Sequence, residues 1–135
     1  GWKMKRIIVF ATIVITFASC RFVSFYGLDY PNISGKIVDS NNQPVNNVKL
    51  YITDHYGKRF NDLSYFSNSE GCFFIKAYTS KKEGIGGCIA FDAHWIYVHT
   101  EKAGYKDANV HISFIKCDTD YDRVVIQNIT LMTNE

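Results

Sequence analysis

The segment WIYVHTEKAGYKD, residues 95–107, constrains the fold more than any other stretch of the chain. Ile96 and Val98 alternate with ring-bearing residues, and this period of two is typical of a β-strand with one buried face. The opposite face then holds the rings of Trp95, Tyr97 and His99. Gly104 follows at a point where the chain has to turn, and the alternation resumes beyond it. We therefore predict a central strand and a tight turn that leads to a neighbouring strand.

Other segments repeat this pattern in shorter form, and groups of Ser, Asn, Gly and Pro separate them. Aromatic residues make up 16% of the chain, and Ile, Val and Thr are plentiful, which favours strands over helices. We expect residues 79–93 to form a long loop. The further strands that we expect are residues 33–39, 48–53, 62–66, 72–78, 110–114 and 124–131. About seven short strands with turns between them predict an all-β chain folded as a β-sandwich.

The amino-terminal residues are typical of a secretory signal peptide. Lys3, Lys5 and Arg6 precede an apolar run of eleven residues, 7–17, and small residues follow it. A membrane-spanning helix needs about 20 apolar residues, so this run is too short to cross a bilayer. Without those three cations, twelve basic residues face thirteen acidic ones, and this balance argues against a nucleic-acid-binding surface.

The signal segment ends in FASC, residues 17–20, which resembles the lipobox of bacterial lipoproteins, although Phe17 stands where Leu is usual. In that motif the Cys is acylated and becomes the first mature residue, and each buried methylene contributes about 0.8 kcal/mol to anchoring. The resemblance implies a signal peptide over residues 1–19, lipidation of Cys20 and a tether over residues 20–31. It also implies a bacterial cell envelope location, at the outer membrane, on its periplasmic or surface side. The alternative is an ordinary secretory signal or an uncleaved anchor.

Three segments, in order, resemble the carboxypeptidase regulatory-like domain, a transthyretin-like β-sandwich common in secreted bacterial proteins. They are ISGKIVDSNNQPVNNVKLYI, SNSEGCFFIKA and IYVHTEKAGYKDANVHI, and the resemblance spans about residues 33–131. The positions that fit are Gly35, Val38, Asp39, Pro44, Val45, Val48, Gly71, Phe73, Ile75, Gly104 and Tyr105. Asn47 stands where the family usually has Gly. The resemblance implies a transthyretin-like, or prealbumin-like, Greek-key sandwich over residues 32–135 that serves as an accessory or binding module.

The four histidines match no metal-binding pattern. His94 and His99 are five residues apart on one strand, so they point to opposite faces and cannot bind one metal together. His111 is expected on the adjacent strand near His99, and His55 in a loop. A zinc or iron site needs about three or four converging ligands. We therefore predict no metal, no cofactor and no enzymatic activity.

Two enzyme families of related topology can be compared with the chain directly. Hydroxyisourate hydrolases end in Tyr-Arg-Gly-Ser, whereas this chain ends in Met-Thr-Asn-Glu. Intradiol dioxygenases carry a His-x-His iron pair on the strand before a Gly-Tyr turn, and residues 95–97, Trp-Ile-Tyr, stand at the corresponding place. A hydrolase or metalloenzyme is therefore only the third interpretation of this sequence.

Three cysteines remain if Cys20 is acylated, and export from the cytoplasm favours their oxidation. We expect a disulfide between Cys72 and Cys88, because Cys88 lies in the expected long loop and the bond would close 17 residues. Such a bond contributes about 3 kcal/mol in the chain-entropy model. The competing pair is Cys72 and Cys117.

Four aromatic side chains form the candidate binding surface: Trp95, Tyr97, Phe74 and Tyr51. They offer a platform for stacking sugars or for a partner protein. The interpretation that we favour is that these rings cover the second face of a two-sheet core, because large exposed apolar patches are rare.

The sequence thus predicts an extracytoplasmic lipoprotein whose β-sandwich is a non-catalytic interaction or structural module. A carbohydrate-binding module that uses the outward aromatic rings is the alternative. The expected partners are the membrane, through lipid on Cys20, and an envelope protein or a glycan.

Overall fold

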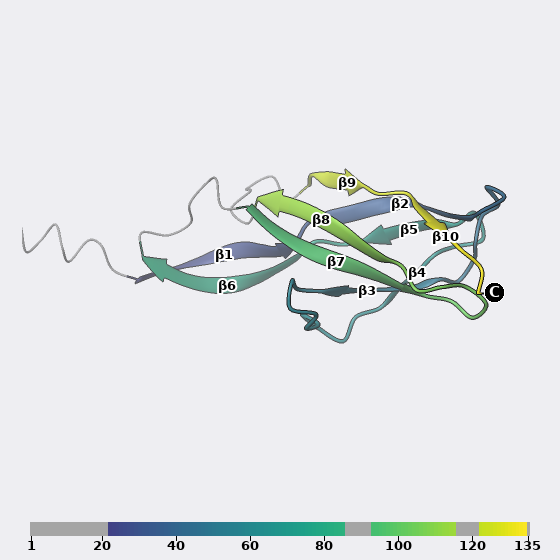
Figure 1. Ribbon diagram of the computed structural model, residues 1–135. Helices are drawn as coiled ribbons and strands as arrows, with labels where there is room; N and C mark the ends of the chain where they lie inside the picture. Colours follow the sequence, from purple (N-terminus) through teal and green to yellow (C-terminus); the bar gives the residue numbers. More distant parts are fainter. Residues whose placement is uncertain (1–21, 86–92, 116–121, 135) are drawn as a thin grey trace, which may run out of the picture.

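The computed structural model describes residues 22–85, 93–115 and 122–134, and strands supply all the regular structure in these ranges. Two sheets of four strands form the body of the molecule, and a two-stranded ribbon extends from one end (Figure 1). The prediction of an all-β sandwich is confirmed, with ten strands in the described ranges instead of about seven. No helix in these ranges is long and apolar enough to span a bilayer.

The strands are β1 (Phe22–Tyr30), β2 (Asn32–Asp39), β3 (Lys49–Thr53), β4 (Tyr65–Phe66), β5 (Cys72–Ile75), β6 (Tyr78–Ile85), β7 (Ala93–Glu101), β8 (Asn109–Ile115), β9 (Val124–Ile126) and β10 (Ile129–Leu131). One sheet has the order β4-β3-β7-β8 and is antiparallel throughout. In the other sheet, β2 pairs antiparallel with β5 on one side and parallel with β9 and then β10 on the other. β7 thus lies between two partners, as expected of the central strand.

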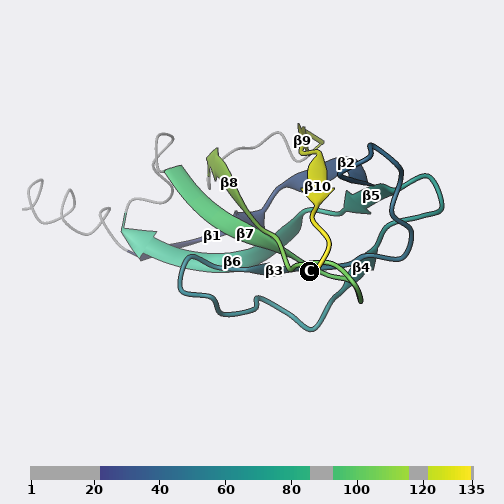
Figure 2. The same ribbon diagram turned by 45° about the vertical axis from the view of Figure 1, so that its right-hand side comes forward.

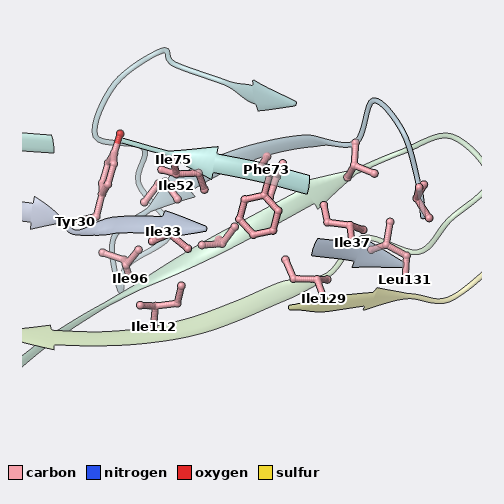
Figure 3. Packing of buried hydrophobic residues seen from close by; sticks show 14 residues of the cluster. Tyr30, Ile33, Ile37, Ile52, Phe73, Ile75, Ile96, Ile112, Ile129 and Leu131 are labelled. Atoms are coloured by element: carbon pink, nitrogen blue, oxygen red, sulfur yellow. The ribbon is translucent and has the colours of Figure 1, made fainter. Parts of the chain in front are cut away.

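The core lies between the two sheets, where alternate residues of each strand point inward (Figure 3). The first sheet contributes Leu50, Ile52, Ile96, Val98 and Ile112. The second contributes Ile33, Ile37, Phe73, Ile75, Ile129 and Leu131. These side chains are at most 5% exposed, and each contributes about 1.5–3 kcal/mol by leaving water. Ile96 and Val98 of β7 are thus buried, as the alternation predicted.

β1, within the expected tether, pairs with β6 to form a ribbon, so the prediction of a loop is wrong for residues 79–85. Their register runs from Phe22 opposite Ile85 to Tyr30 opposite Tyr78, with a shift just before Tyr30. β1 leads into β2, and β5 leads into β6. The stretch β1–β2 therefore pairs with the stretch β5–β6 twice, as β2 with β5 in the sandwich and as β1 with β6 in the ribbon. Both views place the ribbon at the end of the molecule away from β5 and β10 (Figure 1 and Figure 2).

Aromatic packing attaches the base of this ribbon to the sandwich. Tyr30 is fully buried, and its ring stacks on Tyr78 at 5.8 Å and meets Phe60 edge-on at 5.7 Å. The Tyr30 hydroxyl lies 2.9 Å from that of Tyr65 and accepts a hydrogen bond from Asn61 at 3.1 Å. Burial, reinforced by Tyr65, raises the pKa of the Tyr30 hydroxyl far above its ordinary value.

Three turns share one hydrogen-bonding arrangement. In each, a side-chain Oδ1 accepts the backbone N–H groups of the residues two and four positions later, at 2.8–3.0 Å. The residue three positions later has a positive φ. The turns begin at Asp39, Asp54 and Asn68, and the positive φ angles belong to Asn42 (62°), Gly57 (83°) and Gly71 (78°). Asp and Asn favour this geometry because their short side chains replace a backbone acceptor.

Gly35 is required by the close approach of the chain between β9 and β10. Gln127 donates its N–H to the Ser34 carbonyl at 2.8 Å, and Asn128 Oδ1 accepts the N–H of Lys36 at 3.0 Å. A Cβ on Gly35 would lie 1.8 Å from the Gln127 carbonyl oxygen. This glycine therefore has an architectural role here.

Candidate functional site

Rings gather on the outer face of the sheet β4-β3-β7-β8 and on the turn that follows β3. We call this group the aromatic strip, and its members are Tyr51, His55, Tyr56, Trp95, Tyr97, His99 and His111. Side chains directly opposite each other on adjacent strands have Cβ atoms about 5 Å apart, so outward rings in register touch. The strip is therefore a direct consequence of strand pairing.

The centre of the strip consists of two cross-strand pairs. Tyr51 on β3 lies opposite His99 on β7, and the two rings stack with centroids 4.9 Å apart and planes 10° apart. Tyr97 on β7 lies opposite His111 on β8, and these rings meet edge to face at 5.7 Å. The rings of Tyr97 and His99 are 6.4 Å apart and connect the two pairs.

Trp95 extends the strip toward the turn that begins at Asp54. Its indole stacks on His111 at 6.2 Å and lies 5.0 Å from the ring of His55, which contacts Tyr56 at 4.0 Å. Trp95 is 41% exposed and Tyr56 is 85% exposed. Solvent therefore reaches large apolar ring surface at this end of the strip.

His99 is held by both of its ring nitrogens. Nδ1 lies 2.6 Å from Asn109 Oδ1, and Nε2 lies 2.6 Å from the Thr53 hydroxyl. In the neutral imidazole Nδ1 donates to the amide oxygen, and Nε2 accepts from the hydroxyl. Neither nitrogen is available to a metal without the loss of one of these hydrogen bonds.

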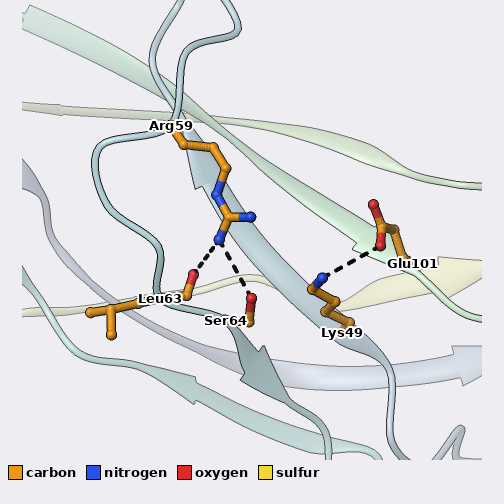
Figure 4. A network of polar contacts seen from close by, with 5 residues as sticks. All are labelled: Lys49, Arg59, Leu63, Ser64 and Glu101. Atoms are coloured by element: carbon orange, nitrogen blue, oxygen red, sulfur yellow. Dashed lines mark hydrogen bonds and ion pairs between the residues drawn. The ribbon is translucent and has the colours of Figure 1, made fainter.

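Charged side chains border the Tyr51 end of the strip, and Figure 4 draws three of them, Lys49, Arg59 and Glu101. The Arg59 guanidinium lies 4.8 Å from the Tyr51 ring centre, and its Nη2 donates to the Leu63 carbonyl at 2.8 Å. Lys49 and Glu101 form an exposed ion pair at 3.9 Å, and such pairs contribute little to stability. Burial raises the pKa of the Tyr51 hydroxyl, and the negative charge of Glu101 adds to the rise.

Three of the four residues of the predicted binding surface share this face. Tyr51, Trp95 and Tyr97 belong to the strip, whereas Phe74 lies on β5 in the other sheet and is 54% exposed there. The interpretation that these rings cover a second face of the core is wrong, because they lie on the outer face and Ile96 and its alternating neighbours fill the core. The sequence did not identify His55, Tyr56 and His111 as members, since membership depends on strand register and on the turn after β3.

His94 and His99 lie on opposite faces of β7, as predicted, and His94 contacts Phe114 at 6.3 Å. Among the described residues, no group of three or more His, Cys, Asp and Glu has an arrangement that would hold a metal ion. The predictions of no metal and no cofactor stay predictions.

The expected disulfide and lipidation sites lie largely outside the described residues. Cys72 is exposed at the start of β5 and forms no disulfide with another described residue. Cys88, Cys117, Cys20 and the expected signal peptide fall outside the described ranges. The disulfide and the acylation therefore stay predictions.

No protein-family model and no curated protein matches the chain. Among solved structures, it is similar to 3-chlorocatechol 1,2-dioxygenase from Rhodococcus opacus 1CP, with a TM-score of 0.45 and 12% identity over 77% of this chain and 59% of that chain. It is also similar to catechol 1,2-dioxygenase from Acinetobacter sp. ADP1 inhibited by bound mercury, with a TM-score of 0.44 and 10% identity over 76% of this chain and 52% of that chain. The chain thus spans about half to three fifths of the length of these two proteins. At such identities the likeness concerns the fold alone.

Proposed function

We propose that the chain is a non-catalytic binding module, tethered to a bacterial envelope membrane by lipid on Cys20, and that the aromatic strip is its contact surface. The observation that carries the binding role is the continuous set of rings on the outer face of β3, β7 and β8. Tyr and Trp are enriched at interfaces because they combine apolar area with a polar group that can reach water or a partner. The lipid tether is supported by the lipobox-like residues 17–20.

The polar groups in the strip support binding over catalysis. Thr53, His99 and Asn109 form a hydrogen-bonded series that has the order of a nucleophile, a base and an orienting group. Thr53, however, is only 3% exposed, so its hydroxyl cannot reach a substrate. We therefore assign this series a structural role: it fixes the imidazole of His99 against the ring of Tyr51.

The second candidate function is carbohydrate binding, and the exposure of Trp95 favours it. An indole that is 41% exposed, with imidazoles at 5.0 and 6.2 Å on two sides, offers an apolar face surrounded by hydrogen-bonding groups. A sugar ring needs both, because its C–H faces are apolar and its hydroxyls are polar. The envelope glycan expected from the sequence is therefore one class of partner.

Affinity purification from detergent-solubilised membranes tests the contact surface. The wild type is compared with Trp95→Ala and Tyr97→Ala, and Phe74→Ala is the matched control because it removes an exposed ring from the other sheet. We expect both strip variants to lose a partner that wild type and control retain, as removal of a central aromatic residue weakens binding by about tenfold or more. Equal retention by all four proteins would exclude the strip as the contact surface.

The mass of the intact protein from the same membranes tests the tether. We expect a mature chain that starts at Cys20 and carries acyl groups, and Cys20→Ala is expected to leave the membrane fraction. A chain without acyl groups, or one that retains residues 1–19, would refute the lipoprotein assignment.

A further inference from the structure

A small cavity opens beside Trp95, where the aromatic strip meets the base of the β1–β6 ribbon. Its volume is about 90 Å³. Its walls are formed by Leu28, Asp29, Asp54, His55, Phe60, His94, Trp95, Ile96 and Phe114. A water needs about 10–15 Å³ of space measured in this way, so the cavity takes several waters or the hydroxyls on one edge of a sugar.

Two of the lining residues, Asp29 and Asp54, carry carboxylates. Asp29 comes from β1 and is only 7% exposed, and Asp54 begins the turn after β3. Asp54 Oδ1 accepts the backbone N–H groups of Tyr56 and Lys58, both at 2.9 Å, and these bonds fix the position of the carboxylate. Carboxylates only accept hydrogen bonds, so a ligand in this cavity has to donate them.

The polar groups of the wall suit a ligand that both donates and accepts hydrogen bonds. His55 and His94 line the same cavity as the two carboxylates, and a neutral imidazole has one nitrogen that donates and one that accepts a hydrogen bond. The wall therefore presents donors as well as acceptors. Sugar hydroxyls can donate to the carboxylates and also either donate to or accept from an imidazole.

The apolar part of the wall is aromatic and joins the strip. Phe60, Phe114 and Trp95 line the cavity, and Trp95 also belongs to the strip, as does His55. A ligand that stacks on the outer face of the indole can thus extend one edge into the cavity. The rest of a longer ligand would pass over the imidazole of His111 and the ring of Tyr97.

We propose that this cavity binds the hydroxyl-bearing edge of a terminal pyranose unit of a glycan, which stacks on Trp95 while the following units lie along the aromatic strip. The inference rests on the proposed binding function of the strip and names its ligand class. Asp54 acts as the hydrogen-bond acceptor, and the imidazole of His55, its neighbour in the chain, lines the same cavity.

Calorimetric titration of the full chain in detergent micelles tests this site. The probes are methyl pyranosides of glucose, galactose, mannose and N-acetylglucosamine, and the corresponding oligosaccharides. Sorbitol is the control ligand, because it has the hydroxyls but no ring to stack. We expect at least one methyl pyranoside to bind, its oligosaccharide to bind more tightly, and sorbitol to bind neither wild type nor variants.

Asp54→Asn is the informative variant, because its fold is expected to be retained. Asn68 already makes the same two backbone hydrogen bonds in its own turn, so an Asn at position 54 can hold the turn while the charge is lost. We expect this variant to weaken pyranoside binding about tenfold, and Trp95→Ala to abolish it. Tyr51→Ala, at the far end of the strip, is expected to weaken only the oligosaccharides. Far-ultraviolet circular dichroism confirms that each variant is folded.

The outcomes separate this inference from the proposed function. If Asp54→Asn binds the pyranosides as wild type does while Tyr97→Ala loses the oligosaccharides, the cavity has no role and the strip remains the contact surface. If wild type binds no sugar, the inference is overturned, and the membrane capture experiment alone decides the function of the strip. Binding of methylamine, Zn²⁺ or Ca²⁺ that Asp54→Asn abolishes, without sugar binding, would also overturn it.

Discussion

Gly35→Ala tests whether the backbone of Gln127 really requires a glycine on β2. The added methyl group would lie 1.8 Å from the Gln127 carbonyl oxygen and 3.0 Å from Phe73 Cε1. The obstructing atom belongs to the backbone, so no change of side-chain rotamer can relieve the overlap. The connection between β9 and β10 has to move away from β2.

The energetic cost follows from what this movement disrupts. It breaks the hydrogen bonds from Gln127 to Ser34 and from Lys36 to Asn128, which contribute about 1 kcal/mol each. It also draws Ile129 and Leu131 of β10 partly out of the core, where each contributes about 1.5–3 kcal/mol. Partial loss of these terms predicts a decrease of about 3–5 kcal/mol in the free energy of unfolding. A domain of this kind has only about 5–15 kcal/mol in total.

Urea unfolding followed by tryptophan fluorescence measures the change, and Gly57→Ala is the matched control. Gly57 has a φ of 83°, but nothing lies within 4 Å of an added Cβ. Its substitution should therefore cost only the left-handed strain, about 1–2 kcal/mol. If Gly35→Ala and Gly57→Ala lower the free energy of unfolding equally, the argument from the Gln127 contact is refuted.

Two further stability predictions concern buried hydroxyls. Ser67→Ala should lower the free energy of unfolding by about 2–3 kcal/mol, because Ser67 Oγ donates to the Val45 carbonyl and accepts from the Val48 N–H in a buried site; a loss below about 0.5 kcal/mol in urea unfolding would contradict this. The free energy of unfolding should also fall as the pH rises above about 10, by about 1.4 kcal/mol per pH unit for Tyr30. In the unfolded chain the Tyr30 hydroxyl loses its proton in this range, whereas burial keeps its pKa higher in the folded protein. Tyr30→Phe should make this slope shallower, and an unchanged slope in urea unfolding at alkaline pH would contradict the assignment.

The strands of the sandwich could be predicted because each has one buried face. In β7, Ile96 and Val98 are 1% and 0% exposed, and the residues between them point outward, as the alternation indicated. β1 and β6 could not be predicted in this way. Their pairing depends on two segments that are distant in sequence, and β6, with the sequence YTSKKEGI, has too few apolar residues to show a period of two.

Two of the three turns that share one hydrogen-bonding arrangement could be predicted from the sequence. The turns at Asp39 and Asn68 lie in stretches dense in Asn, Ser and Gly, and both were expected as turns. The same arrangement at Asp54 lies in DHYGK, where His and Tyr are not typical turn residues, although Asp or Asn followed three residues later by Gly or Asn is common to all three turns. This missed turn is the one that carries His55 and Asp54 to the candidate site.

The candidate site depends on two properties that cannot be read from alternation along a strand: whether a sheet face is covered, and the register of each strand pair. Alternation places Trp95 and Tyr97 on one face of β7, but whether that face is covered depends on which other elements pack against it. The contact of each ring depends on register: Tyr97 meets His111 because these two residues are paired across β7 and β8. A slip of one residue in that pairing would turn the outward face of β8 inward and place Ile112 in solvent. The buried face of β8 therefore fixes the register between β7 and β8, and this register determines which rings belong to the strip. Substitutions that weaken the core at Ile112 should for this reason also disturb binding at Trp95, although the two side chains lie on opposite faces of the sheet.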